Sequence, residues 1–282
     1  MSGEAGSSLA TRPRPALEKT VRLVEAARHA ALVGIAGVIT GVVVGGVGGR
    51  IFMRISAIAA PSYVTGATTD GGNIVGDITI DGTLALVVFV GILSGLVGAV
   101  AYLLSEPWLA WAGRWHGLVF GVLLLAIGST LAFDPGNRDF FILANQELSV
   151  AMLVALFIGF GLLIVPVIAR LERSLPRVDP IRPVAGGWAY LALAAVGLQF
   201  LGAFFIQFFD PDASGAETAP VTVGIAMIGV ALATLGYWVR RIRRGIVPMR
   251  GWTSLAGHGL LLTATALGTI RATGDIGDIL TL

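Results

Sequence analysis

Long apolar segments separated by short polar connections make up most of the chain. Seven such segments can be counted, and most contain enough residues to cross roughly 30 Å of hydrocarbon as a helix. They cover residues 30–49, 83–104, 117–133, 149–169, 188–209, 220–239 and 253–270. The third and the seventh lie near the lower length limit. This pattern predicts an all-α, polytopic integral membrane bundle of about seven transmembrane helices.

Regularly spaced glycines distinguish the first apolar segment. They are Gly37, Gly41, Gly45 and Gly49. Residues four apart lie near one face of a helix, so these glycines would leave a groove without side chains. Such a groove lets another helix approach closely in lipid. A second set of spaced glycines follows in the next apolar segment, at Gly91, Gly95 and Gly98. We therefore expect a glycine zipper between the first two helices.

Basic residues are concentrated in the connections on one side of the predicted bundle. If the N-terminus is cytoplasmic, 15 of the 19 basic residues lie on the inner side. The exceptions are Arg50, Arg54, Arg138 and Arg271. Cytoplasmic loops of membrane proteins are enriched in Lys and Arg, so this distribution predicts a cytoplasmic N-terminus. An odd number of spans then places the C-terminus outside.

This topology divides the chain into a tail and one membrane domain. Residues 1–28 form a cytoplasmic tail, in which 15–28 has the pattern of a helix that would lie along the interface or stand in solvent. Residues 29–282 form a single transmembrane domain. The basic block Arg240–Arg244 is expected to attract anionic lipid of the inner leaflet, at about 1 kcal/mol per basic residue.

The longest outer connection, 61–82, has no basic residue. Ile78 and Ile80 alternate in it with Asp77, Thr79 and Asp81, which is the period of a strand. We expect a short hairpin or cap over the outer end of the bundle.

Composition supports a membrane protein and excludes several classes of site. The chain has 55% hydrophobic and 13% charged residues and a mean hydropathy of +0.85, whereas soluble domains carry about 25% charged residues. A net charge of +2 without a soluble basic face argues against nucleic-acid binding. The absence of cysteine excludes disulfides, thiolate metal sites and iron–sulfur clusters. Lys19 is the only lysine, and this bias toward Arg suggests a bacterium with a GC-rich genome, hence a bacterial cytoplasmic membrane.

Three stretches carry a resemblance to a known type of protein. They are GGRIFMRISA (48–57), GDITIDGTLALVVFVGILSGLVGAVAY (76–102) and NRDFFIL (137–143). In these stretches the chain resembles uncharacterised multi-pass membrane proteins of actinobacterial type. The resemblance covers the first half of the chain and implies no activity for any residue.

Arg50 and Arg54 stand at the outer end of the first segment, where basic residues are uncommon. An arginine within the membrane needs a carboxylate or a water-filled pocket. Partners on the same side are Asp77, Asp81, Asp134 and Asp139, with Arg138 beside the last. These residues predict an outer polar site, which would be an anion-binding site or a structural set of ion pairs.

The remaining polar residues give no sign of catalysis. His116 with His258 is the one pair that would suit a non-covalent haem, and we expect no cofactor because interfacial histidines are commoner. The chain contains no His-Glu-x-x-His sequence, and we expect neither a metal nor an enzyme. All six tryptophans lie near predicted inner helix ends, which is typical of an aromatic belt.

Two functions follow from this sequence. The first is a structural or accessory component of a membrane complex, alone or as a homo-oligomer. The alternative is a small transporter or channel with an outer anion site at Arg50 and Arg54. A water-filled cavity lined by these two residues would favour transport, and a dry bundle would favour the accessory role.

Overall fold

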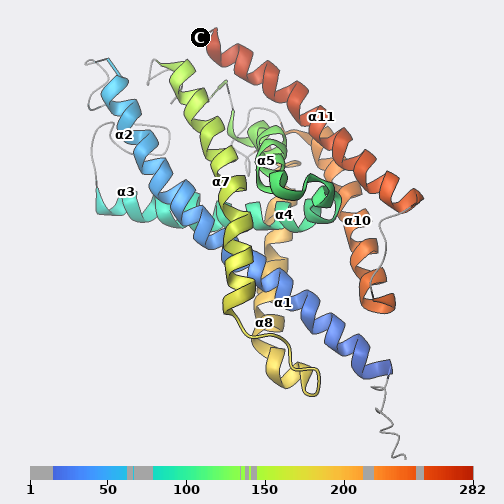
Figure 1. Ribbon diagram of the computed structural model, residues 1–282. Coiled ribbons are helices and arrows are strands. Elements are labelled where there is room, and N and C mark those ends of the chain that lie inside the picture. Colours follow the sequence, from blue (N-terminus) through green and yellow to red (C-terminus); the bar gives the residue numbers. More distant parts are fainter. Residues whose placement is uncertain are drawn as a thin grey trace, which may run out of the picture.

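The computed structural model describes residues 15–61, 66, 79–133, 135–136, 140, 145–211, 219–245 and 251–281. These residues are almost entirely helical, and no strand occurs among them. The helices cross one another at a range of angles (Figure 1). The start of α1 lies at the opposite end of the view from α2 and from the end of α11.

The first helical run is continuous from residue 15 to residue 59. It consists of α1 (Pro15–Gly41), the π-helix η1 (Val42–Gly48) and α2 (Gly49–Ala59). The segment 15–28 therefore continues without a break into the first apolar segment. The run ends at Ala60, which is extended at φ −69° and ψ 143°. Pro61 follows and disfavours helical backbone in the residue before it.

The second run begins at α3 (Ile80–Ala85) and continues through the π-helix η3 (Leu86–Leu93) into α4 (Ser94–Leu109). The Thr79 side chain caps α3 by accepting a hydrogen bond from the Gly82 N–H at 3.1 Å. The predicted strand alternation is therefore wrong at residues 80 and 81, because this cap starts a helix there. Residues 62–65 and 67–78 of the predicted hairpin or cap lie outside the described residues.

A short 3₁₀-helix, η4 (Ala110–Trp115), separates α4 from α5 (His116–Ala132). Gly113 within it has φ 50° and ψ −121°, which breaks the helix direction. The Tyr102 and Phe120 rings are 5.0 Å apart, whereas a continuous helix would separate these residues by roughly 27 Å. The chain thus doubles back at Gly113, and α4 and α5 are separate helices.

Four long helices complete the described fold. They are α7 (Gln146–Ser174), α8 (Pro183–Ile206), α10 (Val221–Arg244) and α11 (Trp252–Leu280). The Asn145 side chain caps α7 by accepting from the Leu148 N–H at 3.1 Å. Gly245, at φ 83°, follows the last residue of α10.

Five helical runs are long and apolar enough to cross a membrane. They are Ala16–Ala59, Ile80–Ala132, Gln146–Ser174, Pro183–Ile206 and Val221–Arg244. The second run contains both predicted segments 83–104 and 117–133. The predicted segment 253–270 lies in α11, which is not among the five. The described chain therefore has the helices of a multi-pass membrane protein, and a count of seven spans stays a prediction.

Trp108 links α4, α10 and α11 in the core. Its ring is 2% exposed and its indole N–H donates to the Thr234 hydroxyl at 2.8 Å. That hydroxyl donates to the Leu104 carbonyl at 2.6 Å, and the ring packs on Gly257 of α11. The expectation of an aromatic belt is therefore wrong for Trp108, since three helices enclose it. Trp252, by contrast, is 87% exposed.

Candidate functional site

The first run packs on the second at a crossing where two glycine-bearing backbones touch. A Cβ atom added at Gly37 would lie 2.5 Å from the Gly95 carbonyl oxygen. Added at Gly41 or Gly45, it would collide with the carbonyl oxygen of Gly91 or Val90, respectively. Close backbone contact of this kind is what small residues permit in lipid. We call this contact the first crossing, and both π-helices lie within it.

The other two predicted packing glycines make different contacts: Gly49 faces the second run less closely, and Gly98 faces another helix. A Cβ atom at Gly98 would lie 2.6 Å from the Phe160 ring, so Gly98 faces α7 and not the first helix. A Cβ atom at Gly49 would be in ordinary contact with Leu86 at 3.4 Å.

A second crossing joins α5 and α7. A Cβ atom at Gly117 would lie 2.8 Å from the Gly161 carbonyl oxygen, and one at Gly161 would collide with the Gly121 backbone. The sequence signal for this contact was the pair Gly117 and Gly121, which are four residues apart. We did not predict it, because two glycines give a weaker pattern than four.

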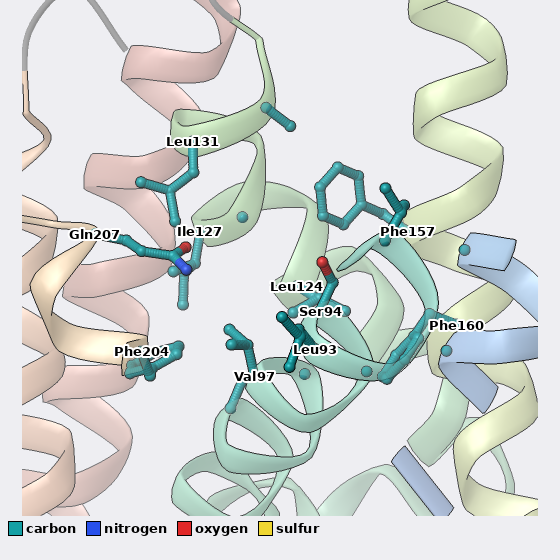
Figure 2. Close-up of a pocket in the computed structure, with 18 of the residues that line it drawn as sticks. Leu93, Ser94, Val97, Leu124, Ile127, Leu131, Phe157, Phe160, Phe204 and Gln207 are labelled. Carbon is teal, nitrogen blue, oxygen red and sulfur yellow. The ribbon is translucent and has the colours of Figure 1, made fainter. Parts of the chain in front are cut away.

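A cavity of about 670 Å³ lies among the first run, the second run, α7 and α8. Figure 2 shows Val97, Leu124 and Leu131 around it, with Phe157, Phe160 and Phe204 at its sides. Its lining also includes Gly41 and Gly45 of the first crossing. The close contact at this crossing thus forms part of the cavity wall.

Two polar side chains reach this cavity among the described lining residues, Ser94 and Gln207. The Ser94 hydroxyl donates to the Phe89 carbonyl at 3.1 Å. Gln207 is half-buried at the end of α8, and its amide points into the cavity (Figure 2). Within the part of the chain that the structure describes, this amide has no hydrogen-bond partner. It is therefore the group available to a bound molecule.

The predicted outer polar site is only partly described. Asp77, Asp134, Arg138 and Asp139 lie outside the described residues. Arg50 donates to the Thr79 carbonyl at 3.1 Å and to the Thr83 hydroxyl, so it binds the start of α3. Asp81 is exposed in the first turn of α3, and no ion pair joins it to Arg50 among the described residues.

Arg54 is exposed on α2 and makes no hydrogen bond or ion pair with the described residues. Neither Arg50 nor Arg54 lines the apolar cavity as far as it is described. An outer anion site stays a prediction.

A polar cluster that we did not predict joins α1, α4 and α7. His29 lies 2.7 Å from Glu106 through Nε2 and 3.6 Å from Glu172 through Nδ1. Both ring nitrogens can donate only when the imidazole carries two protons, and two carboxylates suit that form. Trp238 of α10 packs beside it, with ring centroids 5.8 Å apart. The sequence signal was Glu106, an acidic residue at the end of an apolar segment.

Arg28 ties the neighbouring connection to this cluster. Its guanidinium donates to the carbonyls of Pro176 at 2.8 Å and Leu175 at 3.0 Å. Carbonyl groups at and just after the end of a helix such as α7 receive no hydrogen bond from a helical N–H group. Tyr190 of α8 donates to the same Pro176 carbonyl at 2.9 Å. Arg28 therefore fixes the turn between α7 and α8 against α1.

His116 and His258 have separate surroundings. The His116 ring packs on Tyr102 at 5.6 Å, and the His258 ring packs on Trp108 at 5.8 Å. His258 Nδ1 also lies 2.7 Å from the Ser254 carbonyl. No group of three or more side chains placed to hold a metal ion occurs among the described residues.

No known family model, curated protein or solved structure matches the chain. The resemblance to actinobacterial membrane proteins stays a prediction.

Proposed function

We propose that the protein is an accessory membrane protein, with no catalytic role, whose bundle holds a lipophilic molecule. The observation that carries this proposal is the 670 Å³ cavity, whose described lining is apolar except for Ser94 and Gln207. Pockets of about 300–1,000 Å³ with a mostly apolar wall and a few polar groups are typical of small-molecule sites.

The lining determines the chemistry of the ligand. Leucine, valine and phenylalanine side chains favour a hydrocarbon chain or an apolar ring system. The Gln207 amide can both donate and accept a hydrogen bond, so it suits a carbonyl or hydroxyl group on the ligand. A charged group is disfavoured, because the described lining offers no opposite charge to offset its desolvation. A lipid chain with its ester group fits these conditions.

The accessory role requires a partner surface as well as a ligand. α8 packs on α1 through Gly187, which meets Val24. Its other side carries Leu193 and Val196, both of them exposed. In a membrane this side contacts either lipid tails or a helix of a second chain. Copurifying proteins, or a second copy of the chain, would identify the helix.

We place the N-terminus in the cytoplasm, the C-terminus outside, and the protein in the cytoplasmic membrane of a bacterium. The concentration of basic residues on one side supports this orientation. The chain has no cysteine, so single cysteines can be introduced as labels without a background. A cysteine near the N-terminus should react with a membrane-impermeant maleimide only after the cells are opened.

A matched pair of substitutions on α8 tests the ligand. Ala203 lines the cavity and Ala195 is exposed on the same helix. Ala203→Phe should fill the cavity and lower the amount of lipid that the purified protein retains, measured by mass spectrometry after mild detergent extraction. Ala195→Phe adds the same ring outside and should leave the retained lipid unchanged. Equal retention by both variants and the wild type would refute the proposal.

Gln207→Leu tests the polar end of the ligand. This change keeps the side-chain size and removes the amide, so the cavity should still take a hydrocarbon chain but bind an ester-bearing lipid more weakly. The loss of one hydrogen bond corresponds to about 1 kcal/mol, or roughly fivefold in affinity. The measurement is competition for the cavity between a photoreactive ester lipid and its ether analogue, made with the wild type and with Gln207→Leu.

A transporter or channel with an anion site at Arg50 and Arg54 is less well supported. Arg50 already donates to Thr79 and Thr83, and the cavity is apolar. Replacing both arginines with uncharged residues tests this alternative. If the protein is an anion transporter or channel, anion flux into reconstituted vesicles should fall.

A further inference from the structure

A second, polar cavity of about 460 Å³ lies where α1, the end of α7 and the end of α10 meet. Its described lining includes four arginines, which are Arg22, Arg28, Arg177 and Arg241. Glu25, Glu172 and His29 also line it. Counting formal charges with His29 neutral, four positive and two negative groups leave an excess of two positive charges. The cavity thus differs from the apolar one in charge and in place.

Several of these charged groups already have partners, which determines which of them can bind a ligand. Arg28 is occupied by the carbonyls of Leu175 and Pro176. Glu172 lies beside His29. These residues form part of the cavity wall, and Arg28 satisfies the carbonyl groups that follow α7.

Three arginines from three segments remain. Arg22 of α1 pairs with Glu18 through one amino group at 3.2 Å, and its guanidinium reaches Gly245 at the end of α10. Arg241 of α10 donates through one amino group to the Tyr237 hydroxyl at 3.3 Å and lies 5.0 Å over the Trp238 ring. Arg177, after α7, makes no hydrogen bond or ion pair with the described residues. Each guanidinium therefore keeps donors available to the cavity.

We infer that this cavity binds a phosphate group, using Arg22, Arg177 and Arg241. A guanidinium presents paired donors that match two oxygens of a phosphate, which is why Arg is favoured at such sites. Stacking on Trp238 holds Arg241 in a fixed orientation and so lowers the entropy cost of binding. Basic pockets between membrane helices are typical sites for anionic lipid headgroups.

The inference differs from general attraction of anionic lipid to the basic block. Arg240, Arg243 and Arg244 are exposed at the end of α10 and are not among the lining residues. A general attraction depends on their charge as much as on that of Arg22, Arg177 and Arg241. Binding in the cavity depends on the charge of Arg22, Arg177 and Arg241 alone. The cavity is also separate from the apolar one, so the inference does not rest on the proposed function.

Two triple variants with the same change in charge provide the test. One is Arg22→Gln/Arg177→Gln/Arg241→Gln, in the cavity. The control is Arg240→Gln/Arg243→Gln/Arg244→Gln, on the exposed block. Full-length proteins are reconstituted in nanodiscs of phosphatidylcholine, and binding of added phosphatidylglycerol is measured by native mass spectrometry. The cavity variant should bind at least about tenfold more weakly, because charge-assisted hydrogen bonds are lost. The control should bind as the wild type does.

A second arm distinguishes a lipid headgroup from a soluble phosphate compound. Inorganic phosphate and glycerol phosphate are titrated against the wild type in phosphatidylcholine nanodiscs, and the melting temperature is followed. A rise that the cavity variant lacks assigns the site to a soluble ligand. A response to phosphatidylglycerol alone assigns it to a headgroup. Equal losses of phosphatidylglycerol binding in both triple variants would overturn the inference. So would no loss in either variant together with no rise in melting temperature that depends on the cavity arginines.

A folding defect in the triple cavity variant would not block the test. Arg177 is exposed and contributes no bond to the described structure, so Arg177→Gln should fold normally. It should weaken phosphatidylglycerol binding about threefold or more. Unchanged binding in this single variant would argue against the site. Arg177→Lys keeps the charge and should restore part of the binding.

Discussion

The two glycine crossings solve the same packing problem in different ways. At the first crossing Gly37, Gly41 and Gly45 meet the second run over successive turns, and both backbones there are π-helical in part. At the second crossing the backbone of α7 at Ile158 and Gly161 meets Gly121 and Gly117 of α5, in ordinary α-helices. The first contact therefore involves three glycines of one helix, and the second involves two glycines of α5 with one of α7. Both contacts bring backbone against backbone, so a methyl group added at Gly41 or at Gly161 has no side chain to displace.

Gly41→Ala should be the most damaging substitution. The new methyl group would collide with the Gly91 carbonyl and approach Gly95 Cα, and both are backbone atoms that no rotamer change can move. Separating the helices also disturbs the contacts of Gly37 and Gly45. We expect a loss of about 3 kcal/mol or more in unfolding free energy. The measurement is the stability of the solubilised protein by steric trapping.

Gly161→Ala should cost less, about 1–3 kcal/mol. Its methyl group would also meet backbone atoms, those of Gly121 and Gly117, but separating α5 from α7 disturbs one neighbouring backbone contact, of Gly121 with Ile158, where Gly41 has two. The same steric-trapping measurement ranks it against Gly41→Ala. A larger loss for Gly161→Ala than for Gly41→Ala would reverse the comparison.

Gly98→Ala should have the smallest loss of the three, about 1 kcal/mol. Its methyl group would meet the Phe160 ring and not a backbone atom, and a ring can shift by a few tenths of an ångström. Gly197→Ala is the control, since nothing lies within 4 Å of its Cβ position. It should change the stability by no more than about 0.5 kcal/mol.

Local periodicity predicts the contacts that one element carries and misses those that several elements share. Gly37, Gly41 and Gly45 repeat along one helix, so their groove could be seen in the sequence. His29 and Glu106 are 77 residues apart, and each by itself is an ordinary residue at the end of an apolar segment. Only the packing of α1 on α4 and α7 brings them together. The polar cavity was missed for the same reason.

A local capping interaction overrides a weak alternating pattern. Residues 77–81 alternate as a strand does, but the Thr79 hydroxyl accepts from Gly82 and starts α3. Arg50 then binds the same turn. Among the described residues, Arg50 donates to a backbone carbonyl and a hydroxyl, which satisfy guanidinium donors without a second charge.

The enclosed position of Trp108 gives the protein a built-in optical reporter. An indole held away from solvent, with its N–H bound to Thr234, emits at shorter wavelength than the exposed ring of Trp252. Water-soluble quenchers would suppress the exposed emission and spare the enclosed one. Loss of the spared fraction would signal that α10 or α11 has separated from α4, without any added label.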